Sequence, residues 1–356
     1  MWVWGIGYGV GPPGKSARAA GEPVVSDSLL EVPMNAAAQS LAPGSRLHGS
    51  AYRVVDLLGR GGFSFVYRAL DRDGHAVAIK ELFPPEARRK TFFGLWTRQA
   101  VRKTRDWREL SRRARAEFAL VQSLRHPNVV RVLELFTENG TLYIVMELLS
   151  GTTLHQHLAK HGGLGEADAV VIGTAVGAAL AAAHARGVVH RDVKPGNIMT
   201  CDDGRIVLLD FGIAKSFARS DARSQVGTQN YMAPEQVSGA RQTAAVDVYG
   251  LGATIYHTLT GVPPVRAEDR RAGVRLPPPA ELAPHVSVAV SNAVVRALAL
   301  DPAARQAGVM TFAEELRGVP RSLAAQAPAA GPAWSWWKPL LIVALLAVLA
   351  LTVRGW

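Results

Sequence analysis

The chain has 356 residues, of which 48% are hydrophobic and 19% are charged. This apolar content is enough for one large domain or two lobes, and it excludes a disordered, collagen-like or disulfide-stapled chain. The 40 Lys and Arg residues against 29 Asp and Glu give a net charge of +11, which permits a nucleotide, a nucleic acid or an acidic membrane surface as partner. The single cysteine, Cys201, excludes an intrachain disulfide and a cysteine-built metal site, and it favours a reducing cytosolic setting for the soluble part.

The first 45 residues are rich in Gly, Ala, Pro and Ser and show no sustained hydrophobic period, which predicts a flexible leader over 1–45. The opening lacks a basic segment, which argues against a secretory signal peptide. Residues 9–16 have the spacing of a phosphate-binding P-loop, but Gly21 and Pro23 would break the helix that such a loop requires. Met34 is an alternative start of translation.

From Tyr52 the sequence predicts a small antiparallel β-lobe, because short β-branched and aromatic runs alternate with turn residues. The predicted strands are 52–59, 65–70, 75–82, 129–136 and 141–148. Asn139-Gly140 between the last two is a strong hairpin signal. Between the two groups of strands, apolar residues recur at helical spacing from Asp106 to Leu124.

After Gly151 the pattern becomes mainly helical, beginning with an Ala-rich run from Ala167 to Ala185 and ending near Arg317. Short strands are predicted around 188–190, 197–199 and 205–210. A small β lobe therefore precedes a larger, mainly α lobe. Residues 318–333 read as a Pro/Ala linker.

A Gly-rich turn over 58–66 joins two predicted strands. Glycine presents no side-chain wall, so such a turn allows backbone amides to approach phosphates, although most Gly-rich turns are ordinary hairpins. Lys80 then stands in the middle of an apolar strand. It either faces solvent or is a buried ammonium that needs an anionic partner, for which Glu117 on the next helix is the candidate.

The decisive signal is the run His190-Arg191-Asp192-Val193-Lys194-Pro195-Gly196-Asn197, followed 13 residues later by Asp210-Phe211-Gly212. Phosphoryl transfer needs a carboxylate to orient the attacking hydroxyl, a cation near the γ-phosphate and oxygen ligands for magnesium. The residues that meet these needs are Asp192, Lys194, Asn197 and Asp210.

With these motifs the chain resembles the eukaryotic-type (Hanks-type) protein kinases of the bacterial Ser/Thr branch, from about Tyr52 to Arg317. The resemblance implies a bilobal α+β fold, with a β-rich N-lobe containing one main helix over 52–148 and a mostly α C-lobe over 149–317. It also implies transfer of the ATP γ-phosphate to Ser or Thr hydroxyls of proteins, including autophosphorylation, with Mg²⁺ or alternatively Mn²⁺.

The resemblance also assigns roles within the site. It implies that Lys80 pairs with Glu117 and holds the α and β phosphates, that Asp192 is the catalytic base, and that Asn197 and Asp210 bind magnesium. Lys194 belongs to the catalytic group and favours Ser/Thr over Tyr specificity. Residues implied to bind ATP are Leu58, Gly59, Arg60, Gly61, Gly62, Phe63, Ser64, Phe65, Val66, Ala78, Lys80, Met146 as gatekeeper, Glu147 and Leu149 in the hinge, and Met199.

By the same resemblance, the segments 227–228 and 231–235 receive the peptide, Glu235 pairs with Arg305, and Asp247 begins the central C-lobe helix. A stacked regulatory spine is implied for Val121, Val132, His190 and Phe211, for each of which plain core packing is an equal alternative. The candidate activation-loop sites are Ser220, Ser224 and Thr228. Ser220 and Ser224 are the preferred acceptors, and a phosphate there would pair with Arg191, whereas the resemblance implies that Thr228 contacts Asp192 and Lys194.

One departure from the family is a basic insertion, in which residues 88–115 carry 11 Lys and Arg residues. A solvated face of an extended helix is the simplest interpretation. Contact with an anionic membrane or a regulator is the alternative, and no nucleic acid is expected because no binding motif accompanies the charge.

The last feature is an uncharged apolar run of 15 residues from Pro339 to Val353. Trp and basic residues bracket it, namely Trp334, Trp336, Trp337 and Lys338 before the run, and Arg354 and Trp356 after it. This arrangement predicts a single-pass anchor over 334–356, with the kinase on the cytoplasmic side of the inner (plasma) membrane. A buried soluble helix is the alternative.

Protein substrates are the expected partners, with anionic lipids and a second copy of the chain for trans-autophosphorylation as further candidates. A pseudokinase scaffold and a small-molecule phosphotransferase are the competing functions. A pseudokinase would be expected to lack one of the residues Lys80, Glu117, Asp192, Asn197 and Asp210, and all of them are present. A small-molecule enzyme would not need the peptide-docking segment 231–235.

Overall fold

The structure is a computed structural model of the chain. It describes residues 40–61, 64–82, 89–92, 95–98, 105–211, 229–239 and 242–318. The predicted membrane anchor, the activation-loop candidates Ser220, Ser224 and Thr228, and Gly62 and Phe63 lie outside these residues.

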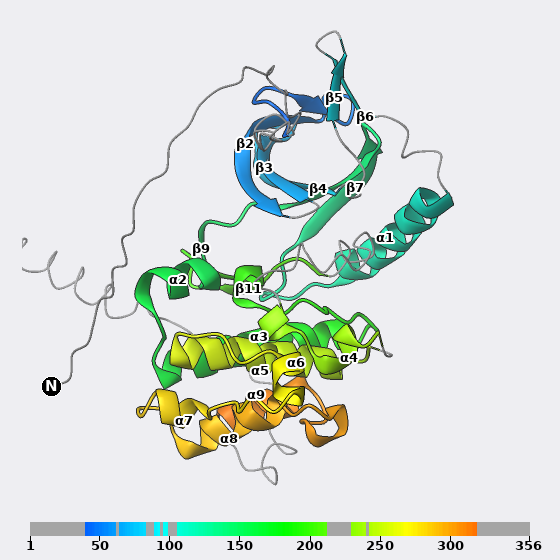
Figure 1. Ribbon diagram of the computed structural model, residues 1–356. Helices are drawn as coiled ribbons and strands as arrows, with labels where there is room; N and C mark the ends of the chain where they lie inside the picture. The colour runs from blue at the N-terminus through cyan, green and yellow to red at the C-terminus, as the bar shows by residue number, and fades with distance from the viewer. Residues whose placement is uncertain are drawn as a thin grey trace, which may run out of the picture. The chain divides into compact units, whose positions relative to one another are not determined.

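The N-lobe is built on a curled six-stranded antiparallel sheet with the strand order β1-β2-β3-β4-β8-β7 (Figure 1). Its strands are β1 (Arg46–Leu47), β2 (Tyr52–Gly61), β3 (Ser64–Leu70), β4 (Ala76–Leu82), β7 (Val132–Glu138) and β8 (Thr141–Glu147). This confirms the predicted β-meander. The Asn-Gly hairpin is confirmed as well, since Asn139 and Gly140 both have positive φ, at 51° and 74°, as a tight two-residue turn requires.

The sheet has two apolar faces because alternate residues point to opposite sides. One face packs against helix α1 (Arg105–Ser123) and joins a cluster that continues into the C-lobe, with Ala78, Leu82 and Phe118 among its members. The other face forms a separate cluster, which we call the N-lobe cluster. Its members are Leu41, Leu47, Val54, Phe65, Tyr67, Ala69, Val77, Ile79, Phe136, Tyr143 and Val145.

The end of the predicted leader packs against the N-lobe. Leu41 is only 7% exposed, and β1 begins at Arg46. The physical reason is that Leu41 and Leu47 cover apolar surface of the N-lobe cluster, which a composition-based reading of a Gly/Ala/Pro/Ser-rich segment does not detect.

The basic insertion is not one extended helix. It contains a two-stranded antiparallel hairpin, β5 (Arg89–Phe92) and β6 (Leu95–Arg98), and α1 starts only at Arg105. Thr91 faces Trp96 and Phe92 faces Leu95 in the hairpin. These β-branched and aromatic residues favour a strand over a helix, so only the second half of the insertion fulfils the helical expectation.

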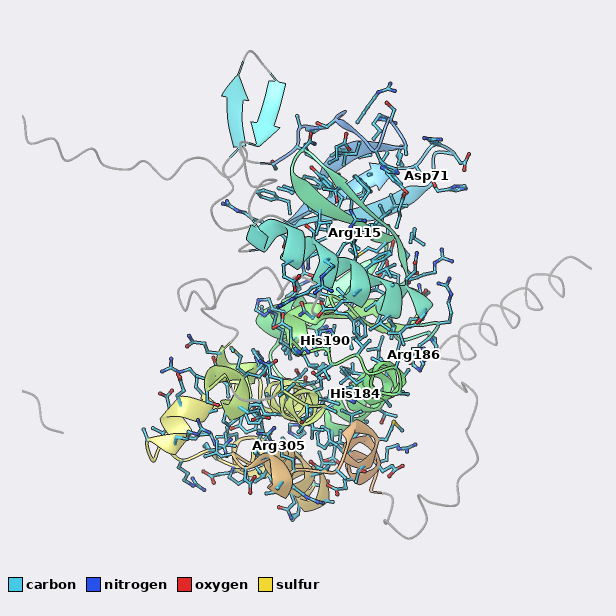
Figure 2. The ribbon with its side chains drawn as sticks, turned by 90° about the vertical axis from the view of Figure 1, so that its right-hand side faces the viewer. Asp71, Arg115, His184, Arg186, His190 and Arg305 are labelled. Carbon is cyan, nitrogen blue, oxygen red and sulfur yellow. The ribbon has the colours of Figure 1, made fainter. Side chains whose placement is uncertain are left out.

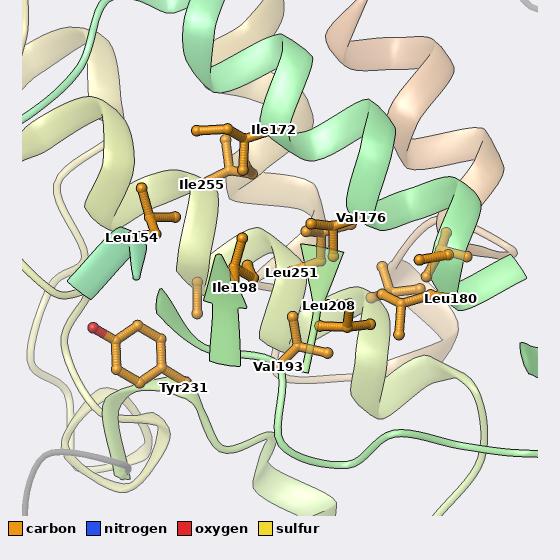
Figure 3. Close-up of a cluster of buried hydrophobic side chains, with 14 of the residues drawn as sticks. Leu154, Ile172, Val176, Leu180, Val193, Ile198, Leu208, Tyr231, Leu251 and Ile255 are labelled. Atoms are coloured by element: carbon orange, nitrogen blue, oxygen red, sulfur yellow. The ribbon is translucent and has the colours of Figure 1, made fainter. Parts of the chain in front are cut away.

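The C-lobe consists mainly of helices around α5. Its helices are α2 (Leu154–His161), α3 (Glu166–His184), α4 (Pro234–Val237), α5 (Ala245–Thr260), α6 (Ala267–Arg271), α7 (Pro279–Leu282), α8 (Val288–Ala297) and α9 (Val309–Leu316), with short 3₁₀ turns η3 (Pro195–Asn197), η6 (Gln229–Tyr231) and η7 (Pro302–Ala304). Helix α5 packs against α3, α8 and α9. Figure 3 shows part of the resulting core, with Ile172 and Val176 of α3 beside Leu251 and Ile255 of α5.

Helix α3 is the one described helix that is long and apolar enough to cross a membrane by length and composition. Its packing explains its apolar composition. Gly173 lies against Leu316 and Ile255, and Gly177 against Ala313, so glycine permits the close approach of α5 and α9. We therefore interpret α3 as a core helix of the C-lobe.

A small sheet with the order β11-β10-β9 lies next to the N-lobe, formed by β9 (Gly151–Thr153), β10 (Ile198–Cys201) and β11 (Ile206–Leu208). Two of its strands were predicted, and β9 was not. The predicted strand at 188–190 is wrong, because the amide of His190 bonds to the Asp247 carboxylate instead of to a neighbouring strand.

Candidate functional site

Lys80 lies on β4, where its strand is buried between β3 and β8, and the residue is only 7% exposed. Its ammonium group contacts Asp210 Oδ2 at 2.7 Å. A buried ammonium needs an anionic partner to offset its desolvation, and this confirms that Lys80 faces the protein interior instead of solvent.

The expected pair of Lys80 with Glu117 is not present in this structure. Glu117 Oε1 instead lies 3.6 Å from Nη1 of Arg191. Each acid therefore meets a different cation, with Asp210 next to Lys80 and Glu117 next to Arg191. The physical reason is that α1 brings Glu117 beside the C-lobe run 190–197, where the guanidinium of Arg191 competes for it.

Asp247 holds the run 190–197 in place. It is a fully buried carboxylate in the first turn of α5. Asp247 accepts the backbone N–H of His190 at 2.8 Å and of Arg191 at 2.7 Å. Arg191 has a φ of 65°, and Asp210 a φ of 53°, although neither is glycine. Such strained backbone persists only where surrounding contacts hold it, and around Arg191 the Asp247 carboxylate supplies two of them.

The imidazole of His190 connects this run to Asp210. Its Nε2 contacts the carbonyl of Leu209 at 2.7 Å, and its Nδ1 lies 3.2 Å from the backbone N–H of Asp192. A carbonyl can only accept, so Nε2 carries the proton and Nδ1 accepts from Asp192. The ring also packs on Phe211 at 4.8 Å between centroids.

Asp192, Lys194 and Asn197 meet at one carboxylate oxygen. Lys194 Nζ lies 3.0 Å from Asp192 Oδ2, and Asn197 Nδ2 donates to the same oxygen at 2.9 Å and to the Asp192 carbonyl at 2.8 Å. The structure therefore brings together the three residues that the sequence placed within six positions of one another. Two donors on one oxygen fix the orientation of the carboxylate.

The donor set suits a hard divalent cation. Because the Asn197 amide nitrogen makes both hydrogen bonds to Asp192, its amide oxygen is the atom left to bind a cation. Asp210 adds a carboxylate. Carboxylate and amide oxygens are ligands that Mg²⁺ and Mn²⁺ accept, so these residues fit the metal that the resemblance implies.

The side chains expected around adenine lie on the face of the sheet that packs toward α1. Ala78 and Met146 belong to that cluster, and Val66 packs against it. The side chain of Phe65, which also belongs to the predicted ATP-binding set, points away from this face. It is 1% exposed and belongs to the N-lobe cluster on the opposite face, because neighbours in a strand point to opposite sides.

The remaining predicted ATP contacts are placed as follows. Leu58, Gly59, Arg60 and Gly61 end β2 and Ser64 begins β3, with Leu58 49% exposed. Glu147 ends β8, and its Oε1 accepts the backbone N–H of Arg131 at 2.7 Å. Leu149 follows it, and Met199 lies on β10 paired with Thr153.

The Lys80–Asp210 pair lines a pocket. It is lined by Lys80, Val121, Val130, Val132, Ile144, Met146, Asp210 and Phe211. Three of the predicted spine residues, Val121, Val132 and Phe211, line it together, and the fourth, His190, contacts the ring of Phe211. The predicted spine residues are thus adjacent, and Met146, the predicted gatekeeper, lines the same pocket.

The segment 229–235 is held against the C-lobe helices. Arg305 forms a bidentate ion pair with Glu235, with Nη1–Oε1 at 2.6 Å and Nη2–Oε2 at 2.8 Å, which confirms the predicted pair. The Tyr231 hydroxyl lies 2.6 Å from His257 Nδ1. Burial raises the pKa of Tyr231 to about 12 and lowers the pKa of His257. The neutral tyrosine is therefore the donor in this bond.

Sequence reasoning missed two residues of this region. His184, at the end of α3, contacts Asp247 Oδ2 at 2.7 Å, close to His190 (Figure 2). The only signal was a histidine at the end of a mostly apolar helix. Glu81, next to Lys80, is fully buried on the other face of the strand. A charged residue at the end of an apolar run was the signal there.

Comparisons with known proteins identify the family of the chain. Residues 52–277 match the protein kinase domain. The chain is 35% identical over 264 residues to the serine/threonine-protein kinase PknD of Mycobacterium tuberculosis, covering 71% of this chain and 37% of that protein. It is 36% identical over 234 residues to the serine/threonine-protein kinase PkaA of Streptomyces coelicolor, covering 61% of this chain and 40% of that one. The chain thus spans less than half the length of these relatives.

Among solved structures, the apo form of PpkA-294 superposes with a TM-score of 0.67 at 28% sequence identity, covering 78% of this chain and 99% of that one.

Proposed function

Because the chain belongs to the protein kinase family, we propose that it is an ATP-dependent kinase that phosphorylates Ser and Thr hydroxyls of proteins. The observation that carries the proposal is the joint contact of Lys194 and Asn197 with one oxygen of Asp192. The names of the relatives PknD and PkaA support the same activity.

In this proposal Asp192 is the general base. Its carboxylate is held by two donors, so it needs no reorientation before it accepts the proton of the attacking hydroxyl. Lys194 stands beside it as a cation that stabilises the charge developing on the transferred phosphoryl group. The His190 hydrogen bonds to Leu209 and Asp192 keep this loop and the strand end before Asp210 in register.

Lys80 binds the phosphates of ATP, and Asn197 and Asp210 hold the divalent metal. When bound, the metal neutralises the charge on the phosphates. The direct contact of Lys80 with Asp210 requires that the two separate, at least in part, for each to perform its own role. Glu117 must then leave Arg191 to become the partner of Lys80.

Control by the activation loop is part of the proposal. Arg191 is the residue that a phosphate on Ser220 or Ser224 would meet, and in this structure its guanidinium contacts Glu117. A phosphate, with about two negative charges, competes with a single carboxylate for the same cation. Mass spectrometry of active protein tests this. An unmodified loop, together with full activity of the Ser220→Ala/Ser224→Ala variant, would contradict it.

We also propose that residues 334–356 anchor the kinase in the inner membrane, with the catalytic domain on the cytoplasmic side. The support is the sequence alone, a run of 15 uncharged residues between tryptophans and basic residues. The basic insertion would add contact with anionic lipids. Full-length protein should resist carbonate extraction, and protein lacking 334–356 should be soluble and active. Soluble full-length protein would contradict the anchor.

The experiment that tests the activity compares acceptors. With γ-labelled ATP and Mg²⁺, the protein should label itself, in trans as a transient homodimer, and a Ser/Thr protein substrate. Small hydroxyl compounds such as sugars or amino alcohols should stay unlabelled. Transfer to a small molecule with no transfer to protein would favour a small-molecule phosphotransferase, and ATP binding without any transfer would favour a pseudokinase.

A further inference from the structure

Glu81 is a charged residue with no surface exposure, placed directly after Lys80 in the chain. Its carboxylate accepts hydrogen bonds from two tyrosine hydroxyls, from Tyr67 at 2.8 Å and from Tyr143 at 3.0 Å. The Thr141 hydroxyl lies 3.2 Å from Glu81 Oε1, the oxygen that also accepts from Tyr143. Burying a carboxylate is costly unless such donors satisfy it. The hydrogen bonds therefore fix the position of the Glu81 carboxylate.

The donors come from both neighbours of the strand that carries Lys80. Tyr67 belongs to β3, and Tyr143 and Thr141 belong to β8. In the sheet register, Glu81 lies opposite Phe65 on β3 and opposite Tyr143 on β8. Side-chain bonds to both neighbours therefore cross-link β4 to the strands on each side of it, in addition to the backbone ladder.

Lys80 and Glu81 point to opposite faces of the same strand. Lys80 reaches Asp210 on the face toward α1, whereas Glu81 lies among the residues of the N-lobe cluster. Any sliding or twisting of β4 against its neighbours would move the Lys80 ammonium. The carboxylate of Glu81 resists such movement, because it would lengthen at least one of its two tyrosine bonds.

The chain segment 40–48 adds a further link, and it lies outside the residues that match the kinase domain. The backbone N–H of Leu41 donates to the Tyr67 hydroxyl at 3.1 Å, and that hydroxyl in turn donates to Glu81. The end of the segment is fastened to β7. There the backbone N–H of His48 donates to Glu138 at 2.6 Å, and the His48 ring stacks on Phe136 at 4.5 Å.

We propose that Glu81 is a positioning residue for ATP binding: with Tyr67 and Tyr143 it fixes the place of Lys80 in the cleft, and residues 40–48 complete the arrangement through Leu41. The inference rests on the proposed kinase function. It assigns a role in catalysis to the face of the N-lobe sheet that does not line the cleft.

The test measures ATP affinity and turnover in the full chain. Glu81→Gln keeps the shape but replaces one acceptor oxygen with an NH2 group, so one tyrosine hydroxyl can no longer donate to residue 81. Tyr143→Phe removes a single donor and serves if Glu81→Gln does not fold. For both we expect a KM for ATP, and a dissociation constant for a fluorescent ATP analogue, raised about 3- to 30-fold, with kcat at saturating ATP changed less than about threefold.

The matched control is Tyr256→Phe, which also removes one buried tyrosine hydroxyl. Tyr256 on α5 donates to the Pro277 carbonyl at 3.0 Å, but it lies in the C-lobe. This variant should lower the thermal midpoint without changing the KM for ATP. Leu41→Pro removes the N–H that donates to Tyr67 and should raise the KM for ATP in the same direction as Glu81→Gln, by about twofold.

The outcomes separate the two proposals. If wild-type protein binds no ATP analogue, the proposed function fails. If wild type binds it and Glu81→Gln and Tyr143→Phe bind it equally well, the positioning role is wrong and the kinase function stands. Equal increases of KM in Glu81→Gln and in the control Tyr256→Phe would also overturn it, because the effect would then be a general loosening of the domain. An unchanged KM in Leu41→Pro would overturn the part assigned to residues 40–48.

Discussion

The pair of Glu235 and Arg305 offers a quantitative prediction about stability. The Arg305 side chain has no surface exposure and that of Glu235 has 11%. Besides its two bonds to Glu235, Arg305 donates to the carbonyls of Ala245 and Ala299, both at 2.9 Å, and its guanidinium lies over the Tyr249 ring at 5.0 Å. It therefore joins the segment 229–235, the start of α5 and the loop after α8.

Arg305→Met should be strongly destabilising. It leaves a nearly buried carboxylate without its cation, and removal of one partner of a buried ion pair typically costs about 3–5 kcal/mol. For a domain of this size, that corresponds to a fall in the thermal midpoint of about 6–20 °C. The double variant Glu235→Gln/Arg305→Met should be more stable than Arg305→Met, because the uncompensated charge is gone.

Urea unfolding, followed by circular dichroism, measures the full double-mutant cycle. The matched control is Arg275→Met. Arg275 also forms a bidentate ion pair, with Glu281 at 2.8 and 2.5 Å. This pair lies at the surface, where the Arg275 side chain is 67% exposed. Its loss should change the midpoint far less. A cost for Arg305→Met below about 1 kcal/mol, or equal effects of the two Arg→Met changes, would refute this reasoning.

Two further predictions concern pH and backbone conformation. Burial lowers the pKa of His257 and of His126 below 6.5, so the unfolded chain binds protons before the folded one does. The contribution of these neutral histidines to the free energy of unfolding should be fully present above about pH 6.5 and should be lost as the pH falls below it. A constant thermal midpoint from pH 7.5 to 5.5 would contradict this. Gly151→Ala should cost about 2 kcal/mol or more, because φ is +144° and a Cβ would collide with the Thr200 carbonyl oxygen. Gly165→Ala, with nothing within 4 Å, should cost much less in the same unfolding assay.

Local sequence signals predicted the parts of the fold that depend on neighbours in the chain. The Asn139-Gly140 turn depends on short-range backbone preference, and helix α1 depends on a repeating apolar pattern. The grouping of Asp192, Lys194 and Asn197 was likewise predictable, because one short loop carries all three.

What could not be predicted depends on which side chains meet across the fold. Lys80 had two acids within reach, and no spacing rule decides between Asp210 and Glu117. Phe65 and Val66 were both predicted to bind ATP, but strand alternation turns their side chains to opposite faces of the sheet. The burial of Leu41 depends on apolar surface contributed by strands that follow it in the sequence.

The most direct test of the account is transfer of labelled phosphate from ATP to protein by wild type and by Asp192→Asn. The variant retains the size of the side chain and loses the base, and a positioned general base contributes about 10²–10⁴-fold to rate. We predict that Asp192→Asn still binds ATP with near wild-type affinity and transfers phosphate at least about a hundredfold more slowly. Transfer at close to the wild-type rate would contradict the kinase mechanism.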